Sequence, residues 1–250
     1  MHAQLPARKR GVTGAFPAVV RRICLPRPGS VLPAQSCGHA SAVDDHGRFP
    51  CFLDVEASGF GPESYPIEIA WSLPDGSITR SLIAPQTVPS WTYWDPQAEQ
   101  VHGIDRDRLR RNGWKPEVVA QRLRDDLAGR TVYTDAPTFD ADWLRRLFSA
   151  VAASSVSGAE ALPFAVENVD ELVLMDLRRP GEAIWQAMVR LDGIKADLNA
   201  VREGKHSAGY DVGYLLALWR QAHGESIKMH HGIGPLPMTT ATGTFVRVKK

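Results

Sequence analysis

Two carboxylates stand two residues apart in the stretch Cys51–Phe60, CFLDVEASGF, which otherwise has the composition of a buried β-strand that runs into a glycine turn. Because side chains alternate along a strand, Asp54 and Glu56 are expected to share one face. Like charges side by side raise each other's pKa unless a cation lies between them. Oxygen ligands of this kind suit Mg²⁺ or Mn²⁺. The pair therefore indicates a metal site, with a solvated face of an edge strand as the alternative.

A second pair, His206 and Asp211, lies far downstream at the start of a helical pattern. Asp211 falls at the edge of an apolar stripe, so its carboxylate is expected to point inward, where it needs a partner such as a shared metal. The stripe consists of Ala208, Val212, Leu215, Leu216 and Trp219. His206 precedes the helix and can lean over the same spot. The alternative is a surface histidine followed by a capping aspartate.

A third acid, Asp140, follows a short predicted strand, Thr131–Thr134, and a loop that contains a proline. The pattern predicts a helix that starts near Asp140. Asp135, in the loop, competes with Asp140 as a metal ligand. The alternative for Asp140 is an N-cap or first-turn acid that stabilises the helix.

The elements that must position these residues form a mixed pattern. Three strands joined by short turns are predicted first, and helices that alternate with short strands follow. The predicted strands are 50–56, 66–73, 78–84 and 131–134, and the predicted helices are 116–127, 141–148, 182–200 and 208–222. We therefore expect an α/β protein whose mixed sheet begins with three antiparallel strands and is flanked by helices.

Composition and charge limit the classes of protein. The chain has 250 residues, is 44% hydrophobic and carries a net charge of +1. Residues 1–43 contain six basic and no acidic residues, which leaves 23 basic and 28 acidic residues for the rest. A protein that grips long nucleic acid usually has a strongly basic surface. Any contact with nucleic acid is therefore expected to be local and short.

The chain is predicted to consist of three regions. Residues 1–46 form a basic, disordered N-terminal extension, residues 47–225 form the main domain, and residues 226–250 form an irregular C-terminal tail. The three cysteines have no Cys-x-x-Cys spacing, which fits a reducing compartment. No apolar run is long enough to span a membrane, so we expect a cytoplasmic protein without a membrane partner.

Taken together, the motifs resemble the DEDDh family of 3′–5′ exonucleases, which includes ribonuclease T and the proofreading subunit of DNA polymerase III. The order is Asp-x-Glu on a strand, Phe139-Asp140 at a helix start, and His206-x₄-Asp211 at a late helix. Two further stretches, Tyr65–Ala70 (YPIEIA) and Val101–Ile104 (VHGI), resemble the family's Pro-Ile-Glu-Ile strand and His-Gly-Ile loop. The resemblance covers roughly residues 49–222.

The resemblance implies a ribonuclease H-like fold and a site for two divalent metal ions, Mg²⁺ or Mn²⁺. The metal ligands would be Asp54, Glu56, Asp140 and Asp211, and His206 would be the general base. The implied reaction is hydrolysis of phosphodiester bonds at the 3′ ends of short or single-stranded DNA or RNA, with release of 5′-mononucleotides. The resemblance leaves a homodimer open.

Substrate binding is expected in the turn that follows Asp-x-Glu and at the His-Gly-Ile loop. The candidates are Ala57, Ser58, Phe60 and His102. Ser58 can donate a hydrogen bond, and Phe60 can stack on a terminal base; the alternatives are core packing for Phe60 and a structural role for His102. Two alternatives to the nuclease remain, a non-catalytic ribonuclease H-like binding module and a phosphodiesterase that acts on a small nucleotide conjugate.

Overall fold

A computed structural model describes residues 49–152, 161–200 and 207–224. Five strands are present there: β1 (Cys51–Ala57), β2 (Pro66–Ser72), β3 (Ile78–Leu82), β4 (Thr131–Thr134) and β5 (Ala165–Asn168). The helices are a 3₁₀ turn (Pro85–Thr87), α1 (Pro96–His102), α2 (Arg106–Asn112), α3 (Pro116–Leu127), α4 (Pro137–Ala152), α5 (Val169–Leu177), α6 (Ile184–Ala200) and α7 (Ala208–Ala222). The predicted extension 1–46 and tail 226–250 lie outside the described residues, as does His206.

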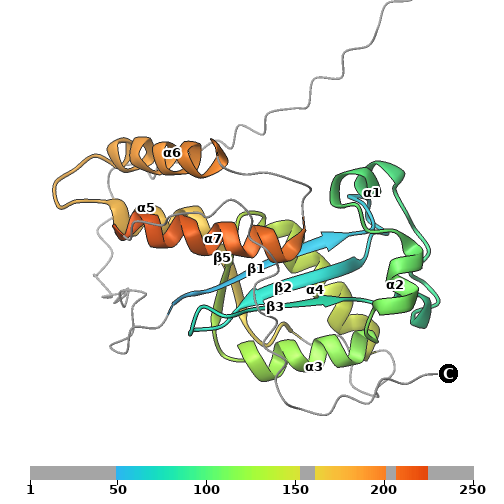
Figure 1. The fold of residues 1–250 in the computed structure, drawn as a ribbon. Coiled ribbons are helices and arrows are strands. Elements are labelled where there is room, and N and C mark those ends of the chain that lie inside the picture. The colour runs from blue at the N-terminus through green and yellow to red at the C-terminus, as the bar shows by residue number, and fades with distance from the viewer. Residues whose placement is uncertain (1–48, 153–160, 201–206, 225–250) are drawn as a thin grey trace, which may run out of the picture. The chain divides into compact units, whose positions relative to one another are not determined.

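The strands form one mixed sheet in the order β3-β2-β1-β4-β5 (Figure 1). β1, β2 and β3 pair antiparallel, whereas β4 pairs parallel with both β1 and β5. The predicted α/β class is therefore confirmed: three antiparallel strands open a mixed sheet, and helices that alternate with short strands follow. β1 lies in the centre, so its backbone is paired on both sides.

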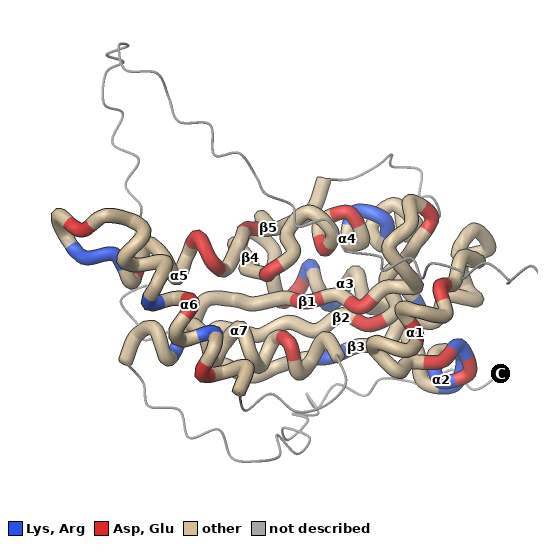
Figure 2. Tube along the Cα trace, turned by 90° about the horizontal axis from the view of Figure 1, so that it is seen from above, with Lys and Arg blue, Asp and Glu red and all other residues tan. Residues whose placement is uncertain are grey.

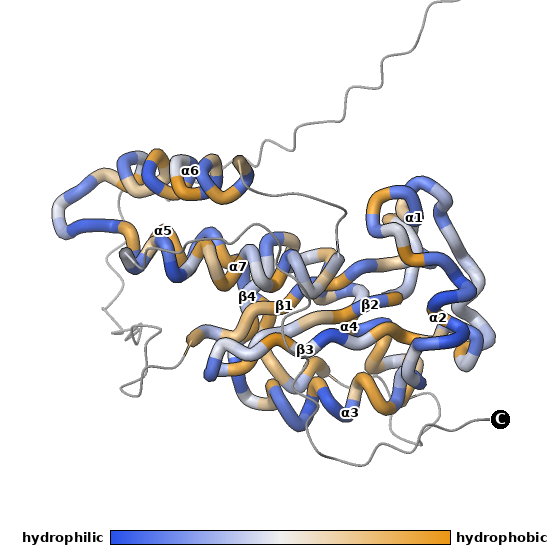
Figure 3. Tube along the Cα trace, viewed as in Figure 1, coloured by the Kyte–Doolittle hydropathy of each residue, from blue (hydrophilic) through white to orange (hydrophobic). Residues whose placement is uncertain are grey.

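Helices cover both faces of the sheet, and each face has its own hydrophobic core. α7 lies across β1, β2 and β3 on one face, while α4 packs on the other face with α3 beside it (Figure 1). Alternation along β1 divides the strand between them: Phe52 belongs to the core under α7, whereas Leu53 and Val55 belong to the core over α3 and α4. Figure 3 shows the resulting hydrophobic stretches along the central strands.

Most of the predicted long elements are observed, and several boundaries differ. α4 begins at Pro137, three residues before Asp140, because proline fits the first helical turn, where its missing N–H costs no hydrogen bond. The predicted strand 78–84 ends at Leu82, and Ile83 makes only an isolated parallel bridge to Trp114. The predicted helix 182–200 begins at Ile184, because the side chains of Glu182 and Gln186 accept hydrogen bonds from backbone N–H groups in the preceding turn.

Two further expectations can be compared with the described part of the chain. Cys51 is a buried free thiol, while Cys24 and Cys37 lie outside the described residues. Among the described helices, none has both the length and the apolar character needed to cross a membrane.

The junction between α2 and β3 generates a prediction about stability. Gly113 ends α2, and a Cβ atom placed there would lie 2.5 Å from the carbonyl oxygen of Leu109 and 2.6 Å from the backbone nitrogen of Ala84. The Leu109 oxygen accepts a hydrogen bond from the N–H of Gly113, and the Ala84 nitrogen donates one to the carbonyl of Trp114, so neither atom can move away without disturbing a backbone bond. We expect Gly113→Ala to lower the free energy of unfolding by about 1–3 kcal/mol, measured by urea denaturation.

Gly193 is the matched control, because it lies inside α6 with no atom within 4 Å of an added Cβ. Gly193→Ala should raise the free energy of unfolding by up to about 1 kcal/mol through helix propensity. Equal stability of the wild type and Gly113→Ala would contradict the close packing of this junction.

Candidate functional site

The central strand presents its two carboxylates to α7. Asp54 and Glu56 follow Phe52 on the same face of β1, and both are partly exposed, whereas Leu53 and Val55 are buried on the opposite face. In the register of the sheet, Asp54 lies opposite Ala70 and Glu56 lies opposite Glu68 of β2. Figure 2 shows acidic residues on these adjacent strands. The two carboxylates therefore lie where the side chains on this face of β1 change from buried to partly exposed.

α7 adds a third carboxylate to this pair. Asp211 lies in the first turn of α7, and one carboxylate oxygen from each of Asp54, Glu56 and Asp211 lies within 4.8 Å of the others. Val212 and Leu215 fix the rotation of the helix, because both are buried in the core over Phe52. The expectation from the apolar stripe, that Asp211 faces the sheet, agrees with this geometry.

Asp140 approaches the same region from the other side. Asp140 is buried in the first turns of α4 and lines a cavity together with Asp54 and Glu56. The Thr134 hydroxyl donates a hydrogen bond to Asp140, and this bond joins the end of β4 to the helix. Asp135 is exposed and does not line the cavity. Asp140 is therefore not the N-cap. It is an acid in the first turn of α4, as the alternative expected, and it is buried inside the fold.

Burial and mutual repulsion disfavour the charged forms of these acids. The pKa of Asp54 is raised well above its ordinary value, first by burial and then by the charges of Asp140, Asp211 and Glu56. Burial also raises the pKa of Asp140, and the hydrogen bond from Thr134 opposes that effect. Such a group is stabilised by a cation placed among the oxygens. The three clustered carboxylates of Asp54, Glu56 and Asp211 offer oxygen ligands of the kind that hard divalent cations prefer.

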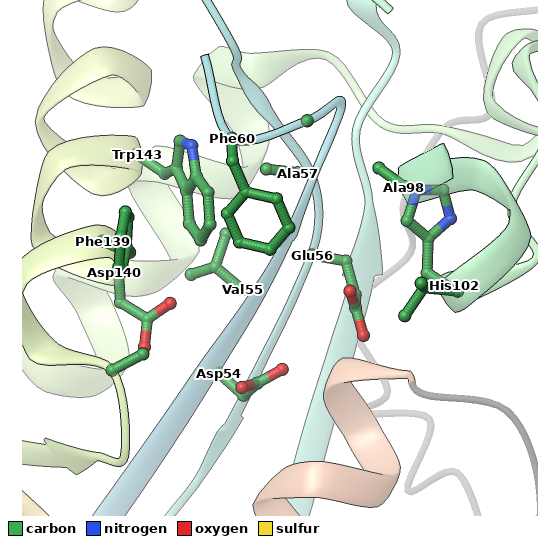
Figure 4. A pocket seen from close by; sticks show the side chains of 13 residues that line it. Asp54, Val55, Glu56, Ala57, Phe60, Ala98, His102, Phe139, Asp140 and Trp143 are labelled. Atoms are coloured by element: carbon green, nitrogen blue, oxygen red, sulfur yellow. The ribbon is translucent and has the colours of Figure 1, made fainter. Parts of the chain in front are cut away.

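The cavity next to the carboxylates has a volume of about 160 Å³. Figure 4 shows Asp54 and Glu56 between a wall from α4 and a wall from α1. The lining residues are Asp54, Val55, Glu56, Ala57, Gly59, Phe60, Ala98, Val101, His102, Ala136, Phe139, Asp140 and Trp143. The cavity therefore combines an acidic floor with largely apolar sides.

Three aromatic rings form the wall on the α4 side. The Phe60 side chain is 72% exposed, and its ring centroid lies 6.0 Å from that of Phe139 and 6.1 Å from that of Trp143. Phe60 is thus not a core residue, which excludes one of the two expectations for it. Phe139 and Trp143 were not among the predicted site residues. Their spacing of four residues, on either side of Asp140, is the sequence signal that could have identified this wall.

The turn after β1 packs closely against a neighbouring loop. Gly59 has φ = +154°, and a Cβ atom there would lie 2.7 Å from a ring carbon of Tyr93. Ser58 differs from its predicted role as a donor to substrate. It is fully buried and is not among the residues that line the cavity. Its hydroxyl oxygen instead accepts a hydrogen bond from the N–H of Tyr65 across the turn. Ala57 does line the cavity.

His102 is the last residue of α1, and its ring has two sides with different environments. Nδ1 accepts a hydrogen bond from the N–H of Ile104 at 3.0 Å, so the neutral ring carries its proton on Nε2. Burial lowers the pKa of His102, which favours this neutral form. Within the described residues, Nε2 is buried and has no hydrogen-bond partner. His102 therefore shapes its loop through Nδ1 and lines the cavity as well.

No protein-family model and no curated protein sequence matches the chain. Solved structures of Exonuclease I are similar to it. Exonuclease I from Methylocaldum szegediense is 18% identical over 68% of this chain, with a TM-score of 0.47. E. coli Exonuclease I, in complex with a 5cy-dA13 oligonucleotide, is also 18% identical over 68% of this chain, with a TM-score of 0.45. This chain spans about 40% of the length of these Exonuclease I chains.

The raised pKa of Asp54, caused first by burial and then by the neighbouring acids, predicts a stability that depends on pH. Because its folded-state pKa lies above the ordinary value near 4, the folded protein binds more protons than the unfolded chain above that pH. Stability without metal should therefore fall as the pH rises through the folded-state pKa. Asp54→Asn removes this loss. In EDTA, we expect it to exceed the wild type in free energy of unfolding by about 1 kcal/mol or more at pH 8, and by less at pH 4.5.

The control for this experiment is Asp192→Asn, which changes an exposed acid of α6 and should alter stability by no more than about 0.5 kcal/mol at either pH. Adding Mn²⁺ should raise the melting temperature of the wild type more than that of Asp54→Asn. A stability difference between Asp54→Asn and the wild type that does not change with pH would contradict the raised pKa of Asp54.

Proposed function

We propose that this chain is a divalent-metal-dependent 3′–5′ exonuclease that hydrolyses phosphodiester bonds at the ends of short or single-stranded nucleic acid and releases 5′-mononucleotides. The observation that carries the proposal is the convergence of Asp54, Glu56 and Asp211 within 4.8 Å, beside a cavity that Asp140 also lines. The 3′–5′ polarity rests on the order of the sequence motifs.

The four carboxylates would hold two Mg²⁺ or Mn²⁺ ions. Asp54, Glu56 and Asp211 offer oxygens from the strand and α7, and Asp140 offers one from α4. Such ions, when bound, would supply stabilisation of the attacking and leaving oxygens of an in-line displacement and would acidify a bound water. The chain contributes the rigid placement of the carboxylates, since each comes from an element fixed by one of the two cores.

The walls of the cavity fit the end of an unpaired strand. Phe60, with Phe139 and Trp143 behind it, presents an exposed aromatic surface on which a terminal base can stack. On the opposite wall, His102 lines the cavity, and its Nε2 would have to become accessible before it could donate a hydrogen bond to the terminal nucleotide. Ala57 has no hydroxyl, so this position can contribute only its backbone and methyl group. A paired base cannot enter such a slot without unstacking, which favours single-stranded ends.

Proton transfer is assigned to His206 on the basis of its position in the sequence motif. A histidine with an ordinary pKa near 6.5 can accept the proton of the attacking water at neutral pH. His102 is less suited to this role, because burial lowers its pKa and its Nδ1 is engaged by Ile104.

The direct test uses oligonucleotides labelled at the 3′ or the 5′ end. The wild type with Mn²⁺ should shorten 5′-labelled single strands stepwise and release a labelled mononucleotide at once from 3′-labelled ones. The double variant Asp54→Asn/Glu56→Gln should lose this activity by at least about 1,000-fold, because the metal ligands are neutralised. EDTA should abolish the wild-type activity.

The matched control is Glu171→Gln/Asp192→Asn, which neutralises two exposed acids on α5 and α6 and should keep wild-type activity. Binding of oligonucleotides without any metal-dependent cleavage would instead identify a non-catalytic module. Cleavage of dinucleotides and small nucleotide conjugates, without cleavage of longer strands, would identify a small-molecule phosphodiesterase.

The aromatic wall predicts a separation of the kinetic constants. Phe60→Ala should raise KM for single-stranded oligonucleotides by roughly 5- to 100-fold, since stacking on an aromatic ring contributes about 1–3 kcal/mol per base. The effect on kcat should be smaller, because Phe60 is not one of the proposed metal ligands. Trp185→Ala removes an exposed aromatic side chain on α6, outside the cavity lining, and should leave both constants unchanged. A Phe60→Ala enzyme with wild-type KM would contradict stacking at this position.

A further inference from the structure

A fifth carboxylate, Glu68, lies on the same face of the sheet as Asp54 and Glu56. It lies directly opposite Glu56 in the β1–β2 register, and its side chain is fully buried. Neighbouring residues in such a pair project from the same face. A buried carboxylate beside other acids is costly, so its interactions must offset that cost.

Glu68 makes a hydrogen bond to the beginning of α7. Its Oε2 accepts a hydrogen bond from the backbone N–H of Ala208 at 3.0 Å. The first N–H groups of a helix have no partner inside the helix and are usually capped by a side chain just before it. Ser207 occupies that position, and its side chain makes no capping bond. The cap therefore comes from a strand 140 residues away in sequence.

Arg80 and Gly209 complete this arrangement. Arg80 lies on β3, and its Nε is 3.5 Å from Oε1 of Glu68. Its aliphatic part passes over α7 at Gly209, where a Cβ atom would lie 3.0 Å from Cδ of Arg80. The first turn of α7 is therefore joined to β2 by a buried hydrogen bond and to β3 by close packing, which leaves it little freedom to shift.

We propose that Glu68 is a positioning residue that holds Asp211 in register with Asp54 and Glu56, and thereby sets the affinity of the site for divalent metal. Asp211 follows Ala208 by three residues in the same helix, so a shift of the helix start moves its carboxylate directly. Glu68 is not itself assigned as a ligand, because it is not part of the cluster of Asp54, Glu56 and Asp211. Its Oε2 accepts from Ala208, and its Oε1 is buried without a hydrogen-bond partner in the described residues, 3.5 Å from Nε of Arg80. The inference rests on the proposed function only in taking the three clustered carboxylates as metal ligands.

Three substitutions of Glu68 test separately the length, the charge and the volume of its side chain. Glu68→Gln keeps an oxygen at the distance of Ala208, Glu68→Asp keeps the charge but is one methylene too short, and Glu68→Leu keeps only the volume. We expect Gln to change the Mn²⁺ dissociation constant by no more than about threefold. Asp and Leu should weaken Mn²⁺ binding by about 10- to 100-fold, as is usual when a group that orients a metal ligand is removed. Mn²⁺ binding is measured on the full chain by electron paramagnetic resonance, without substrate.

Activity gives a second readout. In the Asp and Leu variants the Mn²⁺ concentration for half-maximal cleavage should rise by a similar factor, while KM for the oligonucleotide at saturating Mn²⁺ stays at the wild-type value. Leu218→Ala is the control for general loss of stability, because Leu218 is fully buried on the same helix, away from its first turn. It should lower the melting temperature and leave Mn²⁺ affinity unchanged below that temperature.

The outcomes distinguish the two proposals. Wild-type Mn²⁺ affinity in folded Glu68→Asp would overturn the positioning role, whatever the activity of the protein. Equal weakening in Glu68→Gln and Glu68→Asp would also overturn it, since the hydrogen bond would then not matter. If the wild type binds Mn²⁺ and the Gln and Asp variants differ as expected, but no nucleic acid is cleaved, the nuclease proposal fails and the role of Glu68 stands.

Discussion

The arrangement of this protein depends on holding like charges close together inside a fold. Asp54, Glu56 and Asp211 converge, and Asp140 raises the pKa of Asp54 from the other side of the cavity. Without a cation, each of these groups opposes the charge of the others. They remain together because the strand and the helices that carry them are fixed by interactions elsewhere, and those interactions are mostly apolar.

Each of the two hydrophobic cores fixes part of the elements that carry the carboxylates. Leu53 and Val55 anchor β1 against α4 on one face, whereas Phe52 anchors it against α7 on the other. Since β1 also pairs with both β2 and β4, repulsion between its carboxylates cannot displace the strand without breaking backbone hydrogen bonds. Two buried hydrogen bonds, from the Thr134 hydroxyl to Asp140 and from the Ala208 N–H to Glu68, then set the orientation of the two helices. Rigidity comes from the cores, and fine placement comes from these hydrogen bonds.

The sequence predicted side-chain orientation well wherever a short segment has a regular hydrophobic period. Alternation along residues 51–57 and the stripe of α7 predicted which faces Asp54, Glu56 and Asp211 occupy, because both patterns reflect burial on one side. α1 and α2 are short and largely polar, and α5 is largely apolar, so none of them has the clear one-sided pattern that identifies a helix. Three features depend on contacts between segments that are distant in sequence, so no local pattern encodes them. They are the burial of Ser58, the aromatic wall and the hydrogen bond from the Ala208 N–H to Glu68.

The order of the acids along the chain has a consequence for biosynthesis. Asp54 is made early, Asp140 in the middle, and Asp211 only near the end of the described region. Because a ribosome releases the chain from its N-terminus, β1 and β2 can pair while α7 has not yet been synthesised. During this interval Glu68 has no N–H from Ala208 to bind, and Phe52 lacks the contacts that α7 later supplies. The nascent chain therefore exposes one face of its central sheet, and its acidic cluster stays incomplete, until the last described helix docks.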